Sequence, residues 1–77
     1  MKELVEFMAK SLVDKPDEVR VDEVEKEDAT VIELRVAPED MGKVIGKQGR
    51  TAKAMRQLVK AVGARSGKRV MVEIVET

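Results

Sequence analysis

Cysteine, histidine, tryptophan and tyrosine are all absent from this 77-residue chain, and Phe7 is its one aromatic residue. Without cysteine there is no disulfide or thiolate metal site, and without histidine the commonest general base and metal ligand is missing. The adjacent carboxylates Glu39 and Asp40 fit the first turn of a helix, where they favour its dipole, rather than a catalytic pair. The sequence therefore predicts no enzyme, no metal site, no cofactor and no small-molecule substrate.

Long apolar runs are absent as well. No stretch approaches the roughly 20 apolar residues that a membrane-spanning helix needs. Lys2, Glu3 and Glu6 interrupt the first apolar stretch, which is unlike a secretory signal. We therefore expect a cytoplasmic protein without membrane association, and the length predicts a single domain over residues 1–77.

Acidic side chains are missing from one long segment of the chain. Residues 41–72 carry nine Lys and Arg and no Asp or Glu, whereas residues 1–40 carry six basic and 13 acidic side chains. Glu73 and Glu76 complete the sum, so the net charge of zero conceals charges of +9 and −7 in neighbouring segments. Such asymmetry favours a surface that binds a polyanion over cations that are merely solvated.

Periodicity predicts the order of helices and strands. Apolar residues at helical spacing predict an N-terminal helix over residues 2–14, which the Lys15-Pro16 step ends. Alternation predicts a hairpin of two strands near residues 19–24 and 31–36, with a bulge at Asp22-Glu23 because Val24 breaks the alternation. Helices over residues 38–45 and 50–62 follow, the second ending at Gly63, and then a strand over residues 70–74.

Gly46 and Gly49 lie between the two central helices and enclose Lys47 and Gln48, with Arg50 directly after them. Two glycines three positions apart let the backbone turn tightly and lie flat against a ligand. The spacing does not fit a P-loop, which would need four residues between its glycines and a Ser or Thr after the lysine. A GXXG loop that clamps about four nucleotides is the signature of the KH module. The alternative is that the glycines only cap two helices.

The helix predicted over residues 50–62 has distinct faces. At about 100° per residue, the basic and polar side chains Lys53, Arg56, Gln57 and Lys60 gather opposite the apolar Ala52, Met55, Val59 and Val62. Its N-terminus follows the loop and presents free N–H groups to anions. Ala54, Leu58 and Ala61 widen the apolar arc beyond what core packing needs, which favours a partner surface there.

These residues and their order resemble a type II KH domain, and most closely the small bacterial KH-domain RNA-binding proteins of the KhpA type. The resemblance covers essentially the whole chain and is most specific over residues 37–54, from Ala37-Pro38-Glu39-Asp40 through Val44-Ile45-Gly46-Lys47-Gln48-Gly49 to Ala54. It implies an α+β fold of order α-β-β-α-α-β, with a three-stranded sheet whose helices pack on one face.

The resemblance also implies single-stranded RNA as the ligand, with Gly46, Lys47, Gln48, Gly49, Arg50, Lys43, Lys53 and Ile45 as binding residues. Because aromatic platforms are missing, bases would lie in an aliphatic groove for which Ile45, Val44, Leu34 and Val36 are candidates. The family implies RNA chaperoning or post-transcriptional regulation, linked in some bacteria to cell elongation and envelope maintenance. It further implies a homodimer, or a heterodimer with a larger KH-containing protein of the KhpB (Jag) type.

One alternative from a different class stays open at this point. The domain could be a dimerisation adaptor that mainly holds such a protein partner, with RNA contact secondary. The apolar flank at Ala54, Leu58 and Ala61 favours the adaptor, and the basic loop favours RNA binding.

Overall fold

The computed structural model describes residues 1–75 of the chain. Three helices and three strands follow one another as α1 (Lys2–Leu12), β1 (Arg20–Glu25), β2 (Thr30–Arg35), α2 (Met41–Ile45), α3 (Arg50–Arg65) and β3 (Val70–Ile74). Short 3₁₀ turns at Pro16–Glu18, Pro38–Asp40 and Lys47–Gly49 precede β1, α2 and α3. The expected order α-β-β-α-α-β is confirmed.

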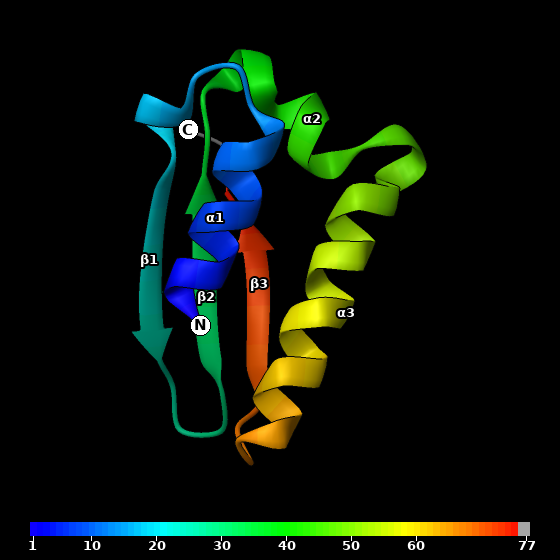
Figure 1. The fold of residues 1–77 in the computed structure, drawn as a ribbon. Coiled ribbons are helices and arrows are strands. Elements are labelled where there is room, and N and C mark those ends of the chain that lie inside the picture. The colour runs from blue at the N-terminus through cyan, green and yellow to red at the C-terminus, as the bar shows by residue number, and fades with distance from the viewer. Residues whose placement is uncertain (76–77) are drawn as a thin grey trace.

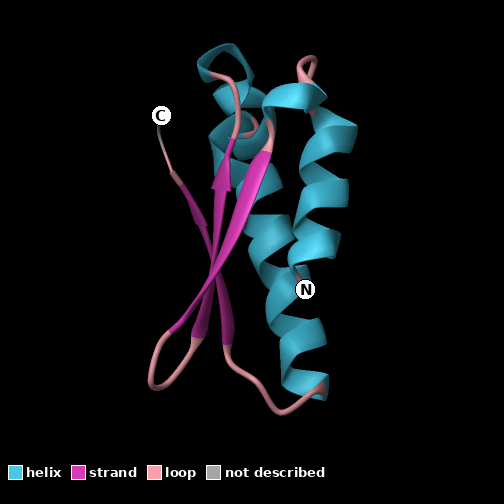
Figure 2. Ribbon diagram, turned by 90° about the vertical axis from the view of Figure 1, so that its left-hand side faces the viewer, coloured by secondary structure: helices cyan, strands magenta, loops and turns pink. Residues whose placement is uncertain are grey.

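The strands form one mixed sheet in the order β1-β2-β3, with β1 antiparallel to β2 and β3 parallel to β2. All three helices lie on the same face of this sheet, and within the described residues the other face carries no helix (Figures 1 and 2). The α+β class with helices on one face is therefore confirmed. No helix within residues 1–75 has both the length and the apolarity to cross a membrane.

The core lies between the sheet and the helices. Side chains at alternate strand positions meet the inner faces of α1, α2 and α3. Its buried members include Val5, Ala9, Val21, Ile32, Leu34, Val36, Val44, Met55, Val59, Val70 and Val72. Because Val44 is fully buried in this core, the five-residue helix α2 is fixed in place despite being too short to be stable alone.

The first two strands pair without the bulge expected at Asp22-Glu23. Partners run in unbroken register from Arg20 with Arg35 to Glu25 with Thr30, so that prediction was wrong. Val21 points into the core, whereas Val24 lies on the face without helices, where its partners along the row are Val31 and Met71. The three-residue spacing thus reflects two apolar faces rather than an inserted residue.

Two helix ends differ from the positions that the sequence predicts. Helix α1 ends at Leu12 and Val13 is already extended, because the amides of Asp14 and Lys15 bond to a side chain far along the chain. Helix α3 continues through Gly63 to Arg65. Gly63 is buried, and a Cβ there would lie 3.0 Å from Val70 Cγ2, so this glycine permits close packing of α3 on β3 rather than ending the helix.

Candidate nucleic-acid interface

The GXXG segment forms a tight turn between α2 and α3. The Gly46 N–H donates to the Gly42 carbonyl at 2.8 Å, and the Gly49 N–H donates to the Gly46 carbonyl at 3.1 Å. Gly46, Gln48 and Gly49 all have positive φ, at 78°, 59° and 74°. Two of these three positions carry glycine, the residue that adopts such conformations without steric cost.

The two glycines of the loop have different structural roles. At Gly46 a Cβ would lie 2.1 Å from Thr51 Oγ1 and 2.8 Å from the Thr51 backbone nitrogen, so the start of α3 packs directly against this glycine. At Gly49 a Cβ would meet no atom within 4 Å. Gly46 is therefore required by the fold, whereas Gly49 leaves open space at the surface where a ligand backbone can approach closely.

Cationic side chains surround the loop and are free to meet an anion. Lys47, Gln48, Arg50 and Lys53 are exposed, and within residues 1–75 no carboxylate pairs with these three cations. One guanidinium nitrogen of Arg50 donates to Gln48 Oε1 at 3.1 Å, which holds the Gln48 side chain against the start of α3. The predicted loop residues therefore do lie together at one end of the molecule.

The N-terminus of α3 adds to this positive region. The helix has 16 residues and its N-cap is Gly49; the Arg50 N–H donates to the Lys47 carbonyl, and within residues 1–75 no side chain caps the first turn. Unpaired N–H groups and the helix dipole at such an end attract anions. Loop backbone, helix end and the cations Lys47, Arg50 and Lys53 thus converge on one place, as the sequence predicts.

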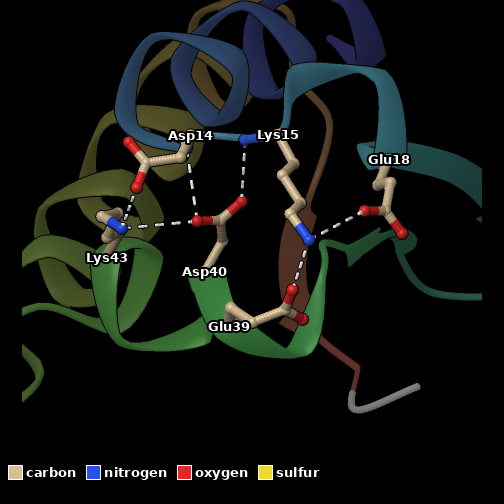
Figure 3. Close-up of polar contacts among 6 residues, drawn as sticks. All are labelled: Asp14, Lys15, Glu18, Glu39, Asp40 and Lys43. Carbon is tan, nitrogen blue, oxygen red and sulfur yellow. Dashed lines mark hydrogen bonds and ion pairs between the residues drawn. The ribbon is translucent and has the colours of Figure 1, made fainter.

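Lys43 differs from the other predicted cations because it is already paired. Its Nζ lies 2.6 Å from Asp14 Oδ2 and 3.5 Å from Asp40 Oδ1 (Figure 3). These carboxylates raise the pKa of Lys43, chiefly through the hydrogen bond to Asp14. Its role as an RNA-binding residue stays a prediction, and any phosphate would have to compete with both carboxylates.

Three of the proposed groove residues are core residues instead. Val44 and Leu34 are fully buried and Val36 is 1% exposed, so none of them offers surface to a base. They point into the space between sheet and helices, which apolar alternation cannot distinguish from a surface groove. Ile45 is 38% exposed and remains the one groove candidate of this set, directly before the loop.

A cleft that the sequence did not predict runs between α3 and the edge strand β3. It has a volume of about 610 Å³, and we call it the α3–β3 cleft; its lining includes Arg56, Lys60, Lys68, Arg69, Val70 and Met71. Arg56 crosses toward the strand, where its Nε donates to the Val72 carbonyl at 3.3 Å. Met71 is half exposed. The cleft thus combines cationic walls with aliphatic surface, and the only sequence signal for it was the acid-free run over residues 41–72.

Asp40 attaches the segment after α1 to the segment that carries the loop. Its carboxylate accepts the Asp14 N–H at 3.2 Å, the Lys15 N–H at 3.0 Å and the Lys43 ammonium (Figure 3). Burial opposes its charge, since Asp40 is 1% exposed, but the two backbone hydrogen bonds and Lys43 outweigh burial and lower its pKa. At the rim of this cluster Lys15 pairs with Glu39.

This network predicts a pH-dependent contribution of Asp40 to stability. An Asn at this position would offer one acceptor to two backbone donors and no charge to Lys43, so Asp40→Asn should lower the Tm at pH 7 by on the order of 10 °C. Because the folded-state pKa lies below the ordinary value, the contribution is full above about pH 4 and disappears as pH falls further. Thermal melts from pH 7 to pH 2 should therefore show the two curves converging.

The matched control is Glu39→Gln, which alters an exposed neighbouring carboxylate and should move the Tm much less. Equal effects of the two substitutions, or a Tm difference for Asp40→Asn that does not narrow as the pH falls from 7 to 2, would contradict this role of Asp40.

A second candidate surface is apolar and lies across α1 and α3. The predicted interface residues Ala54, Leu58 and Ala61 are all exposed, and Leu58 is 45% exposed. Phe7, at 71%, and Leu12, at 40%, extend this surface onto α1, where a shallow groove joins the two helices. We call it the α1–α3 apolar surface. Sequence periodicity alone could not show that α1 lies beside α3.

Comparison with known proteins agrees with this architecture. A family model described as the KH domain of KhpA and KhpB matches residues 2–74. A Clostridium perfringens protein named RNA-binding protein KhpA is 63% identical over 75 residues, covering 97% of this chain and all of the relative. Proteins of the same name from Aquifex aeolicus and Borreliella burgdorferi are 57% and 50% identical, covering 99% and 96% of this chain and 96% and 90% of the relatives. With the fold, the GXXG turn and these matches in agreement, the chain belongs to the KhpA/KhpB family of KH-domain proteins.

Proposed function

We propose that this protein binds single-stranded RNA at the GXXG loop and along the α3–β3 cleft. The observation that carries the proposal is the convergence, at one end of the molecule, of the tight glycine turn, the N-terminus of α3 and cations that have no carboxylate partner within residues 1–75. The names of the relatives support RNA as the ligand.

In this mechanism the loop holds the sugar–phosphate backbone and the cleft holds bases. Lys47, Arg50 and Lys53 supply positive charge, and the open space at Gly49 lets the RNA backbone approach the protein backbone. Bases would rest on Met71 and on the aliphatic stems of Arg56 and Lys60 rather than stack on aromatic rings. Ile45 would contact the nucleotide nearest the loop.

The direct test is fluorescence anisotropy with a labelled single-stranded RNA and with the same strand annealed into a duplex. A loop and cleft that accept splayed bases should prefer the single strand, since a duplex hides its base edges from side chains. Equal affinities for the two forms would mean that the protein acts only as a cationic surface, and no binding of either would overturn the proposal.

Binding should weaken as salt increases. Each phosphate contact on a single strand contributes about −0.7 to the slope of log K against log salt, so three or four contacts predict a slope of about −2 to −3. Lys53→Gln should make the slope less steep by about 0.7, whereas Arg20→Gln, exposed on the edge strand β1 away from the α3–β3 cleft, should leave it unchanged. A wild-type slope near zero would show that the basic segment does not touch phosphates.

We further propose that the protein acts as a dimer in RNA chaperoning or post-transcriptional regulation. One module that grips about four nucleotides has little affinity alone, and pairing two could raise avidity by roughly 100-fold or more. The α1–α3 apolar surface supports such pairing, since small side chains at Ala54 and Ala61 permit close approach of a second helix. Its exposed Phe7 and Leu58 would become buried.

Ala61→Asp tests the dimer. Ala61 is exposed, so the monomer should tolerate the charge and keep its circular dichroism spectrum. An apolar dimer interface should not tolerate a buried charge at this position. We expect a shift to monomer in sedimentation equilibrium and weaker RNA binding. An unchanged dimer would place the interface elsewhere, and a wild-type monomer at high concentration would exclude homodimerisation.

The same surface favours the second candidate, an adaptor for a larger KH-containing protein of the KhpB type. Under that function the α1–α3 apolar surface would bind the partner and RNA contact would be secondary. Co-purification with such a partner that Ala61→Asp abolishes, without single-stranded RNA binding by the chain alone, would favour the adaptor over the RNA-binding function.

A further inference from the structure

Among the four cations predicted to serve the loop, Lys43 alone has carboxylate partners within residues 1–75. Lys47, Arg50 and Lys53 have none there, whereas the Lys43 ammonium lies 2.6 Å from Asp14 and 3.5 Å from Asp40. Lys43 is also the one of these four cations that precedes the turn, on α2, three residues before Gly46. In the RNA-free protein, Lys43 is therefore already paired with two carboxylates.

The two carboxylates that hold Lys43 differ in their other bonds. Asp40 is buried and also accepts two backbone N–H groups, so its orientation is fixed whatever Lys43 does. The Asp14 side chain is 77% exposed, and within the described residues its carboxylate bonds only to Lys43. The backbone of Asp14 is held in place by Asp40, which keeps this exposed carboxylate beside Lys43 (Figure 3).

An exposed ion pair of this kind is weak enough to be exchanged. Solvent and side-chain entropy offset most of its Coulomb energy, so a phosphate oxygen can replace the Asp14 carboxylate on the Lys43 ammonium. The exchange nevertheless reduces RNA affinity, because the pair must break and Asp14 then lies close to a phosphate of like charge.

We propose that Asp14 competes with an RNA phosphate for Lys43 and so limits the affinity of the loop for RNA. The inference rests on the proposed function, since it assigns a restraint to the same RNA-binding site. Asp14 is not itself an RNA contact here; it acts through Lys43. Its removal should therefore strengthen binding, which is the reverse of what loss of a binding residue does.

The test compares Asp14→Asn with Asp17→Asn by anisotropy with single-stranded RNA over a range of salt concentrations. Asp17 is also exposed, and the described structure shows no ion pair or side-chain hydrogen bond for it, so it controls for net charge. We expect Asp14→Asn to tighten binding about two- to fivefold at low salt and to steepen the salt slope by roughly 0.7, one phosphate contact. Asp17→Asn should change both much less.

Lys43→Gln separates competition from a structural effect of Asp14. In the wild-type background it should weaken RNA binding modestly, because one phosphate contact is lost, and in the Asp14→Asn background it should abolish the gain. A role of Asp14 in folding alone would alter the Tm without this dependence on Lys43. Equal effects of Asp14→Asn and Asp17→Asn, or a gain that survives Lys43→Gln, would overturn the proposal.

The proposed RNA binding and the proposed competition by Asp14 can be contradicted by different results. If wild-type protein binds single-stranded RNA through the loop but Asp14→Asn brings no gain, only the competition is wrong. If wild-type protein binds no RNA, the proposed function and the competition are both wrong.

Discussion

The double variant Lys47→Asp/Gln48→Asp should fold like the wild type and bind single-stranded RNA about 100-fold more weakly, because like charges brought together at an interface cost several kcal/mol. Both side chains are exposed at the tip of the loop. Gln48 has a left-handed backbone conformation, with φ of 59° and ψ of 26°, which Asp also adopts more readily than most residues. The substitution thus places two negative charges where a phosphate should lie and leaves the core untouched.

Anisotropy with labelled RNA and thermal melts by circular dichroism measure the two halves of this prediction. The control is Arg20→Asp, which also adds negative charge but lies exposed at the start of β1, the edge strand on the opposite side of the sheet from the α3–β3 cleft. It should reduce affinity only slightly. A double variant that melts normally and binds RNA at wild-type affinity would exclude the loop as the binding site.

Alanine at the two glycines of the loop should separate stability from binding. Gly46 has φ of 78° and ψ of 173°, a region essentially restricted to glycine, and its added Cβ would lie 2.6 Å from Thr51 Cβ. Strain and collision together should destabilise Gly46→Ala by roughly 3 kcal/mol or more, which lowers the Tm by more than about 10 °C. RNA binding should be lost with the turn.

Gly49→Ala is the matched control, because it changes the same residue type three positions away. Its backbone is also left-handed, but the new methyl group meets no protein atom, so we expect a cost of only about 1 kcal/mol. RNA affinity should still fall, since the methyl group occupies the space through which the RNA backbone approaches. Identical melting curves for the two variants would contradict the different roles assigned to the glycines.

Much of this architecture could be predicted from the sequence because local signals agree with one another. Helical and alternating periods give the order of elements, and the glycine spacing with its flanking cations gives the loop. The core face of α3 followed from Ala52, Met55 and Val59, all of which are buried.

The features that could not be predicted depend on contacts between distant residues. Helix α1 ends early because the backbone N–H groups of Lys15 and Asp14 donate to the carboxylate of Asp40, which lies 25 and 26 residues further along the chain. From the sequence alone Gly63 is typical of a residue that ends a helix, and only its close contact with Val70 in the folded structure shows its packing role. The sequence likewise offers no means of telling that Val44 fills the core while Met71 lines a cleft, since both are apolar residues of the acid-free segment 41–72.

The central claim is that RNA follows the GXXG loop and the α3–β3 cleft, and amide NMR spectra recorded during titration with a short single-stranded RNA test it most directly. We predict that shifts concentrate at residues 46–53 and at the cleft residues Arg56, Lys60 and 68–72. The helix-free face over β1 and β2, marked by Val24 and Glu33, should stay unchanged. Shifts confined to that face, or to Phe7 and Leu58 on the α1–α3 apolar surface, would contradict the claim.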